Sequence, residues 1–154
     1  DVVHVPMGFR TPVPVALVHP ALSVETRRAR GVLPSAVDRP TVIAQMANTA
    51  AIVAAVATGD LALLGRSIDD RIAEPPRAVL VPGFPDAKIA ALHAGALGCS
   101  FSGSGPTMFA ICPDARSAQV VADAMAAAFA GHGLSATGWV SAIRAQGATV
   151  ERFA

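Results

Sequence analysis

The chain has 154 residues, of which 53% are hydrophobic and 15% are charged, and its formal net charge is +1. This length suits one domain with a hydrophobic core, and the apolar composition excludes an intrinsically disordered chain. The near-even balance of 12 basic and 11 acidic residues gives no indication of nucleic acid or an anionic membrane as a partner. Because the sequence opens with Asp1 and lacks a basic n-region, we expect no signal peptide, a cytoplasmic location and a piece of a longer chain.

The first half of the sequence combines one alternating apolar stretch with several helix signals. We predict a strand over 12–18 and helices over 23–31, 38–57 and 61–68. Ser23 and Asp60 are suitable N-caps, because their side chains can accept hydrogen bonds from backbone N–H groups of the first helical turn. The most apolar part of the long helix, 42–57, is too short for a membrane span, which needs about 20 residues, so we expect a buried helix.

The second half of the sequence mixes strands with helices. Pro75 and Pro76 displace the residues before them from the α region, so we expect the stretch 72–77 to be extended. We also predict helices over 85–94 and 114–131 and strands over 97–101, 107–112, 137–144 and 148–153, the last two joined by a turn at 146–147. The recurring strand–turn–strand units indicate an α+β fold, in which an antiparallel sheet packs against helices on one side.

The two cysteines, Cys99 and Cys112, have neither the spacing of a metal site nor that of a redox motif. A hairpin centred near Ser104 would place Cys99 opposite Phe109 and Cys112 opposite Ala96. The two thiols would then be several residues apart, too far for the Cα separation of about 5.5 Å that a disulfide prefers. We therefore expect both cysteines to be reduced.

A glycine-rich loop, Ser102-Gly-Ser-Gly-Pro106, lies between two of the predicted strands. Its glycines allow positive φ angles, and consecutive backbone N–H groups in such a turn can bind an anion. The hydroxyls of Ser102, Ser104 and Thr107 are further donors. The spacing differs from that of a Walker loop, a dinucleotide fingerprint and a nucleophile elbow. From these residues alone, an anion-binding loop and a plain hairpin turn both stay open.

The stretch 98–110, Gly-Cys-Ser-Phe-Ser-Gly-Ser-Gly-Pro-Thr-Met-Phe-Ala, resembles the third conserved motif of the GHMP small-molecule kinases. Its Ser-Gly-Ser-Gly-Pro-Thr form is found in homoserine kinases and in some kinases of the methylerythritol isoprenoid pathway. Two further stretches, 19–34 and 72–84, resemble homoserine kinases in their Thr-x-x-x-Arg and Glu-Pro-x-Arg elements, although Glu25-Thr26 stands where that family has Ser-Thr. The resemblance runs nearly end to end, and it implies that residues 1–154 are a GHMP-kinase C-terminal domain, a ferredoxin-like sandwich.

The family's first motif, which wraps the ATP phosphates, has no counterpart in this sequence. The resemblance therefore implies that the N-terminal ATP-binding domain, with its acidic residues near Mg²⁺, is absent from this chain. We expect no catalytic or metal-binding residue here and no activity of this chain alone. As part of a full-length kinase with ATP and Mg²⁺, it would phosphorylate the side-chain hydroxyl of L-homoserine to O-phospho-L-homoserine in threonine biosynthesis. The expected partners are L-homoserine, ATP and the chain's own N-terminal domain, with a homodimer left open.

A carboxylate-binding set follows from the resemblance, residue by residue. Thr26 and Arg30 are four apart on a predicted helix and so share a face, and an Arg fork binds a carboxylate well. The family's substrate-binding residues correspond to Thr26, Arg30 and Arg77. Glu74 is expected to orient Arg77 through an ion pair.

The third-motif loop is expected to shape the site rather than to supply a base. Its residues are Ser102, Gly103, Ser104, Gly105 and Thr107. The histidines His19, His93 and His132 have no Cys or carboxylate partner at ligand spacing, so we expect structural or surface roles for them. Two other functions stay open: a stand-alone α+β amino-acid-binding or regulatory module, and another GHMP kinase, such as the isoprenoid-pathway diphosphocytidyl-methylerythritol kinase.

Overall fold

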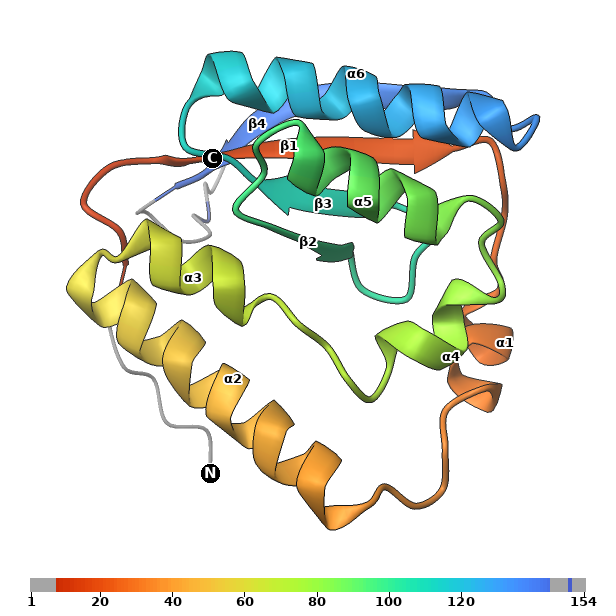
Figure 1. Cartoon of the computed structure of the whole chain (residues 1–154), viewed down its shortest axis with the longest axis horizontal. Coiled ribbons are helices and arrows are strands. Elements are labelled where there is room, and N and C mark those ends of the chain that lie inside the picture. Colours follow the sequence, from red (N-terminus) through yellow and green to blue (C-terminus); the bar gives the residue numbers. More distant parts are fainter. Residues whose placement is uncertain (1–7, 145–149, 151–154) are drawn as a thin grey trace.

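The computed structural model describes residues 8–144 and residue 150. In chain order the elements are β1 (Val13–Pro20), α1 (Thr26–Gly31), α2 (Arg39–Thr58), α3 (Leu61–Ser67), α4 (Glu74–Ala78), α5 (Phe84–His93), β2 (Gly98–Phe101), β3 (Met108–Ile111), α6 (Ala115–Gly131) and β4 (Ala136–Ile143) (Figure 1). The four strands form one antiparallel sheet in the order β2-β3-β1-β4. The predicted α+β fold with an antiparallel sheet is confirmed. The strand expected over 148–153 and the turn at 146–147 lie outside the described residues, apart from Val150.

Helices cover both faces of this sheet, and not one face as expected. Successive residues of a strand point to opposite faces, and β1 is apolar on both. Ala16 and Val18 pack in the cluster that includes α5 and α6, whereas Val13 and Val15 pack with α2 and α3. Figure 1 shows α5 and α6 on the side of the sheet away from α2 and α3. A central strand that is apolar at consecutive positions needs cover on both sides, which explains the second layer.

Asp side chains define the start of three helices. Asp38, Asp60 and Asp114 each accept a hydrogen bond from the backbone N–H three residues later, at 3.0, 2.8 and 2.7 Å. This N-cap geometry satisfies donors that have no partner inside the helix. The predicted starts of α2, α3 and α6 are therefore confirmed. Ser23 is not an N-cap, because α1 starts only at Thr26 and its cap residue makes no side-chain bond.

The segment around Pro75 and Pro76 is helical, so the prediction of an extended stretch over 72–77 is wrong. Proline has no N–H group, and the first helical turn is the place where that group has no partner. The carboxylate of Asp70 accepts the backbone N–H groups of Ile72 and Ala73 at 2.9 and 2.8 Å, which turns the chain into α4. Tertiary and local hydrogen bonds thus outweigh the preference of residues that precede a proline.

The long helix α2 is largely exposed, so the prediction of a buried helix is wrong. Ala55 is its one buried residue, while the side chains of Ile43 and Met46 are 55% and 66% exposed. The helix is also 20 residues long, four more than its most apolar stretch. Among the described helices it is the one long and apolar enough to cross a membrane by length and composition, a test that core helices of soluble proteins also pass.

The hairpin of β2 and β3 is displaced by one residue from the predicted register. Cys99 lies opposite Ala110, and not opposite Phe109. The backbone N–H of Ser102 donates to the carbonyl of Thr107 at 2.8 Å, which closes the loop and places its centre between Ser104 and Gly105. Cys99 and Cys112 are both buried and unbonded, and burial raises the pKa of the Cys99 thiol to about 12.

Candidate functional site

Arg77 connects three segments that are far apart in the sequence. It lies on α4, and its Nη1 donates to the carbonyl oxygen of Gly103, in the third-motif loop, at 3.1 Å. Its Nε donates to the carbonyl oxygen of Ala29, on α1, at 3.3 Å. Figure 1 shows α1 and α4 next to each other at the lower right of the molecule. Through Arg77, the stretch 72–84 contacts the two other stretches that resemble homoserine kinases, 19–34 and 98–110.

The helix expected under Thr26 and Arg30 is present as α1. Ala29 is buried, and its carbonyl is the group that Arg77 contacts, whereas Thr26 and Arg30 are exposed. Arg77 therefore lies against the turn of α1 that joins these two residues. The structure places Arg77 against the short helix that carries Thr26 and Arg30.

Within the described part of the chain, both hydrogen-bond acceptors of the Arg77 guanidinium are uncharged. Both hydrogen bonds end on backbone carbonyls, and within the described part of the chain neither Arg77 nor Arg30 forms an ion pair with a carboxylate. An Arg side chain carries five N–H donors in a fixed fork, and two bonds leave donors free. Positive charge and free donors at this position suit an incoming carboxylate.

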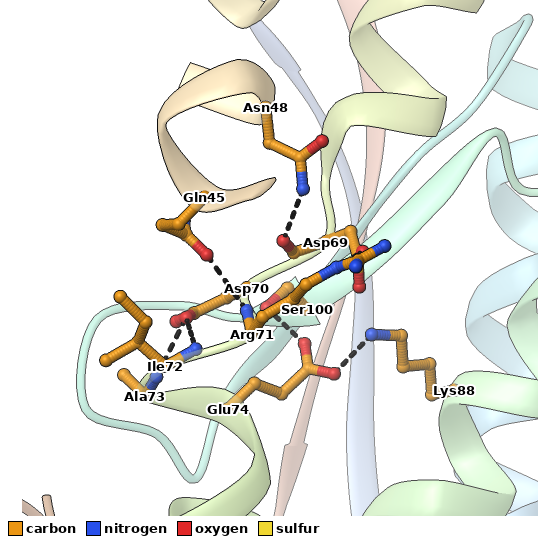
Figure 2. Close-up of polar contacts among 10 residues, drawn as sticks. All are labelled: Gln45, Asn48, Asp69, Asp70, Arg71, Ile72, Ala73, Glu74, Lys88 and Ser100. Atoms are coloured by element: carbon orange, nitrogen blue, oxygen red, sulfur yellow. Dashed lines mark hydrogen bonds and ion pairs between the residues drawn. The ribbon is translucent and has the colours of Figure 1, made fainter. Parts of the chain in front are cut away.

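Glu74 does not form the expected ion pair with Arg77. Its carboxylate accepts a hydrogen bond from the Ser100 hydroxyl at 2.6 Å and forms an ion pair with Lys88 (Figure 2). Glu74 is buried, and a buried carboxylate needs a charged or hydrogen-bonding partner to offset its desolvation. Lys88 on α5 and Ser100 on β2 meet this need, so Glu74 fastens α4 to the core instead of contacting Arg77.

The third-motif loop has the backbone form that its sequence predicts. Gly103 and Gly105 have φ angles of +64° and +79°, a region that favours glycine. Ser102 is exposed and Ser104 is half-buried. The hydroxyl of Thr107 is 2.8 Å from Nδ1 of His19, at the end of β1. His19 thus contacts the loop, a role that the sequence did not reveal, although the residue opens one of the stretches that resemble homoserine kinases.

Polar residues on α2 hold the segment that leads into α4. The Gln45 side-chain oxygen accepts the backbone N–H of Arg71 at 2.9 Å, and the Asn48 amide donates to the carbonyl of Asp69 at 2.9 Å (Figure 2). These residues interrupt the apolar run of α2. They explain why a helix with so much exposed apolar surface still has a fixed place beside residues 69–71, which lead into α4.

Among the described residues, no three His, Cys, Asp or Glu side chains gather in a way that could hold a metal ion. The buried carboxylate of Glu74, one helical turn from Arg77, already pairs with Lys88.

Comparison with known proteins places this arrangement in a family. The family description "GHMP kinases C terminal" matches residues 52–131. A homoserine kinase of Chlorobium phaeobacteroides is 46% identical over 136 residues, covering 87% of this chain and 42% of that protein. The crystal structure of a homoserine kinase from Cytophaga hutchinsonii superposes with a TM-score of 0.84 at 41% identity, over 92% of this chain and 44% of that one.

A more distant structure has the same fold. The mevalonate kinase of L. major in complex with R-mevalonate gives a TM-score of 0.65 at 14% identity, over 79% of this chain and 40% of that one. In all three comparisons the chain spans less than half the length of the relative. Together with the match over 52–131, these likenesses show that the chain belongs to the GHMP kinase family, as a C-terminal domain related to that of homoserine kinases.

Proposed function

We propose that this chain is the amino-acid-binding part of an ATP-dependent homoserine kinase. The kinase transfers the γ-phosphoryl group of ATP to the side-chain hydroxyl of L-homoserine and releases O-phospho-L-homoserine and ADP. The proposal is supported by the likeness to homoserine kinases over most of the chain. One observation carries it: the guanidinium of Arg77, without a carboxylate partner in the described structure, lies between α1 and the third-motif loop.

The site would hold homoserine by its charged end. Homoserine has an α-carboxylate at one end and a reactive hydroxyl at the other. Arg77 and Arg30 would bind the carboxylate, with the hydroxyl of Thr26 as a further donor. Phosphoryl transfer depends mainly on position and charge stabilisation, so fixing the carboxylate limits where the hydroxyl can lie. The third-motif loop would form the wall beside the bound amino acid.

The remaining parts of the reaction belong to residues beyond those described. The family uses ATP with Mg²⁺, which supplies the phosphoryl group when bound, and this sequence has no phosphate-wrapping motif. We therefore propose an N-terminal ATP-binding domain, with residues 1–154 as the C-terminal domain. Threonine biosynthesis and a cytoplasmic location are part of the same proposal, because the product and the soluble substrates belong to central amino-acid metabolism.

The test is an acceptor screen with the full-length protein. ADP release and product mass would be measured with Mg-ATP and, in separate reactions, L-homoserine, mevalonate or diphosphocytidyl-methylerythritol. Phosphorylation of homoserine alone supports the proposal, and preference for either isoprenoid alcohol contradicts it. The 154-residue chain by itself should give no ADP above the no-enzyme control. Turnover by that chain would show that the ATP site is not in a separate domain.

A further inference from the structure

A buried polar cluster joins α4, α5 and the sheet. Glu74 on α4 contacts both Lys88 on α5 and Ser100 on β2, and all three are drawn in Figure 2. The side chains of Glu74 and Lys88 are 11% and 21% exposed. Lys88 is also the only lysine of the sequence, where the other 11 basic residues are Arg. Removing the two charges of such a pair from water is energetically costly. The pair joins α4 to α5, so it holds α4 against the core.

The helix α4 depends on outside contacts for its position. It has five residues, of which two are prolines that cannot donate a backbone hydrogen bond. Helices this short are not stable by themselves, so tertiary contacts decide where the helix lies. One end is held by Asp70, which accepts the N–H groups of Ile72 and Ala73. Glu74, the first helical residue, supplies the anchor to the core.

Arg77 lies one turn after this anchor. The bonds from Arg77 to the carbonyls of Ala29 and Gly103 are 3.3 and 3.1 Å long, at the long end of the range for a hydrogen bond. A shift of the α4 backbone would therefore move the guanidinium away from both carbonyls at once. Glu74 anchors the same short helix from which Arg77 reaches α1 and the third-motif loop.

We propose that Lys88 is a positioning residue for homoserine binding, acting through its ion pair with Glu74 on the place of α4 and hence of Arg77. This inference rests on the proposed function. Without Lys88, Glu74 would be a buried carboxylate with the Ser100 hydroxyl as its one described partner. An unpaired buried charge is strongly unfavourable, so the carboxylate would turn toward solvent and carry α4 with it.

The first test separates positioning from simple loss of stability. In the full-length kinase, Lys88→Met should raise the KM for homoserine roughly tenfold, with kcat and the KM for ATP nearly unchanged. A purely structural role would reduce the amount of folded enzyme, which lowers the apparent kcat and leaves both KM values unchanged. Lys88→Arg keeps the positive charge, so its KM for homoserine should stay close to that of the unaltered enzyme. An unchanged homoserine KM in Lys88→Met would overturn the inference.

A double-mutant cycle tests whether Lys88 acts through Glu74. In a Glu74→Gln background the buried charge is gone, so adding Lys88→Met should change the homoserine KM little further. If each substitution instead raises the homoserine KM independently, so that the two factors multiply in the double mutant, the proposed coupling is contradicted. Asp86→Asn is the matched control, because it removes an exposed ion pair of the same helix with His132, at 2.6 Å, and among the described residues neither side chain forms a hydrogen bond or an ion pair with α4. An equal rise of KM in this control would also contradict the inference.

A second readout does not depend on activity. The Nε–H signal of Arg77 can be followed by NMR in the 154-residue chain and identified by its loss in Arg77→Gln. Its hydrogen exchange should become roughly tenfold faster in Lys88→Met and stay unchanged in Asp86→Asn, because the bond to the Ala29 carbonyl protects it. If the full-length protein does not phosphorylate homoserine, the proposed function fails, while this measurement still decides whether Lys88 positions Arg77. Unchanged exchange in Lys88→Met would refute that role.

Discussion

The guanidinium of Arg77 donates to the backbone carbonyl of Gly103 at 3.1 Å, across 26 positions of sequence. Gly103 has φ +64°, so the carbonyl that Arg77 contacts belongs to a turn that only glycine adopts easily. The same guanidinium contacts α1. The three parts of the candidate site are therefore joined by one side chain, and its removal should affect the site without removing a large apolar contact.

Replacing Arg30 or Arg77 by Ala in the full-length kinase should lower kcat/KM for homoserine by about 10- to 200-fold. A hydrogen bond to a charged group contributes about 1.5–3 kcal/mol, and about 1.4 kcal/mol corresponds to a factor of ten. The KM for ATP should change far less, and steady-state kinetics with each substrate varied in turn gives both values. Arg27→Ala is the control on the same exposed helix. If Arg27→Ala impairs homoserine use as strongly as Arg30→Ala, the effect comes from α1 as a whole and not from a carboxylate contact.

Gly98→Ala should destabilise the domain by about 1–3 kcal/mol, because added atoms in a packed core force the backbone to shift. A Cβ on Gly98 would collide with the backbone of Gly65, where α3 lies directly on β2. Urea unfolding of the 154-residue chain measures the change. The control is Gly31→Ala, since a Cβ at that position meets nothing within 4 Å. Equal stability of Gly98→Ala and the unaltered chain would show that α3 and β2 are not so closely packed.

The cap of α6 should make stability depend on pH. The pKa of Asp114 is lowered by hydrogen bonds from the backbone and side chain of Ser117, so the carboxylate form is favoured in the folded state. Its stabilising effect is present above the unfolded pKa, near 3.8, and is lost as the pH falls through the lower folded pKa. Asp114→Asn, which keeps an accepting oxygen, should therefore lose less stability on acidification than the unaltered chain. Thermal unfolding as a function of pH tests this, and an identical acid loss in both chains would argue against the role of Asp114.

Both thiols should be free and slow to react in the native protein. Burial raises the pKa of Cys99 and of Cys112, so little reactive thiolate is present near neutral pH. Titration with a thiol reagent should find two groups in the unfolded, unreduced chain and almost none at early times under native conditions. Finding no free thiol after unfolding would contradict the unbonded cysteines of the structure.

Local signals predict the element boundaries correctly where those signals are strongest. Asp38, Asp60 and Asp114 mark helix starts because N-capping depends on residues within one turn. The errors occurred where contacts made outside the element decide. The helical state of Glu74–Ala78 depends on Asp70 and on the core partners of Glu74, and the exposure of α2 depends on which neighbours reach it.

The residues of the candidate site also differ in whether the sequence alone can reveal them. Thr26, Arg30 and Arg77 could be named from their spacing and from the resemblance, and their assignment to homoserine stays a prediction. Lys88 could not be named, because its only sequence signal is that it is the single lysine among many arginines. Its relation to Glu74 spans 14 positions and two helices, so it exists only in the folded chain.

Arg77 donates to α1 and to the third-motif loop through backbone carbonyls, and these contacts do not depend on the side chains of the residues that offer them. The carbonyl of residue 29 is offered by any amino acid, so the exposed side chains of α1 can change without loss of that contact. The match to the family description covers residues 52–131, which include Arg77 and the loop but not α1. If α1 contacts the acceptor as proposed, exchanging its exposed residues between relatives would change the acceptor preference while the Arg77 contact stays the same.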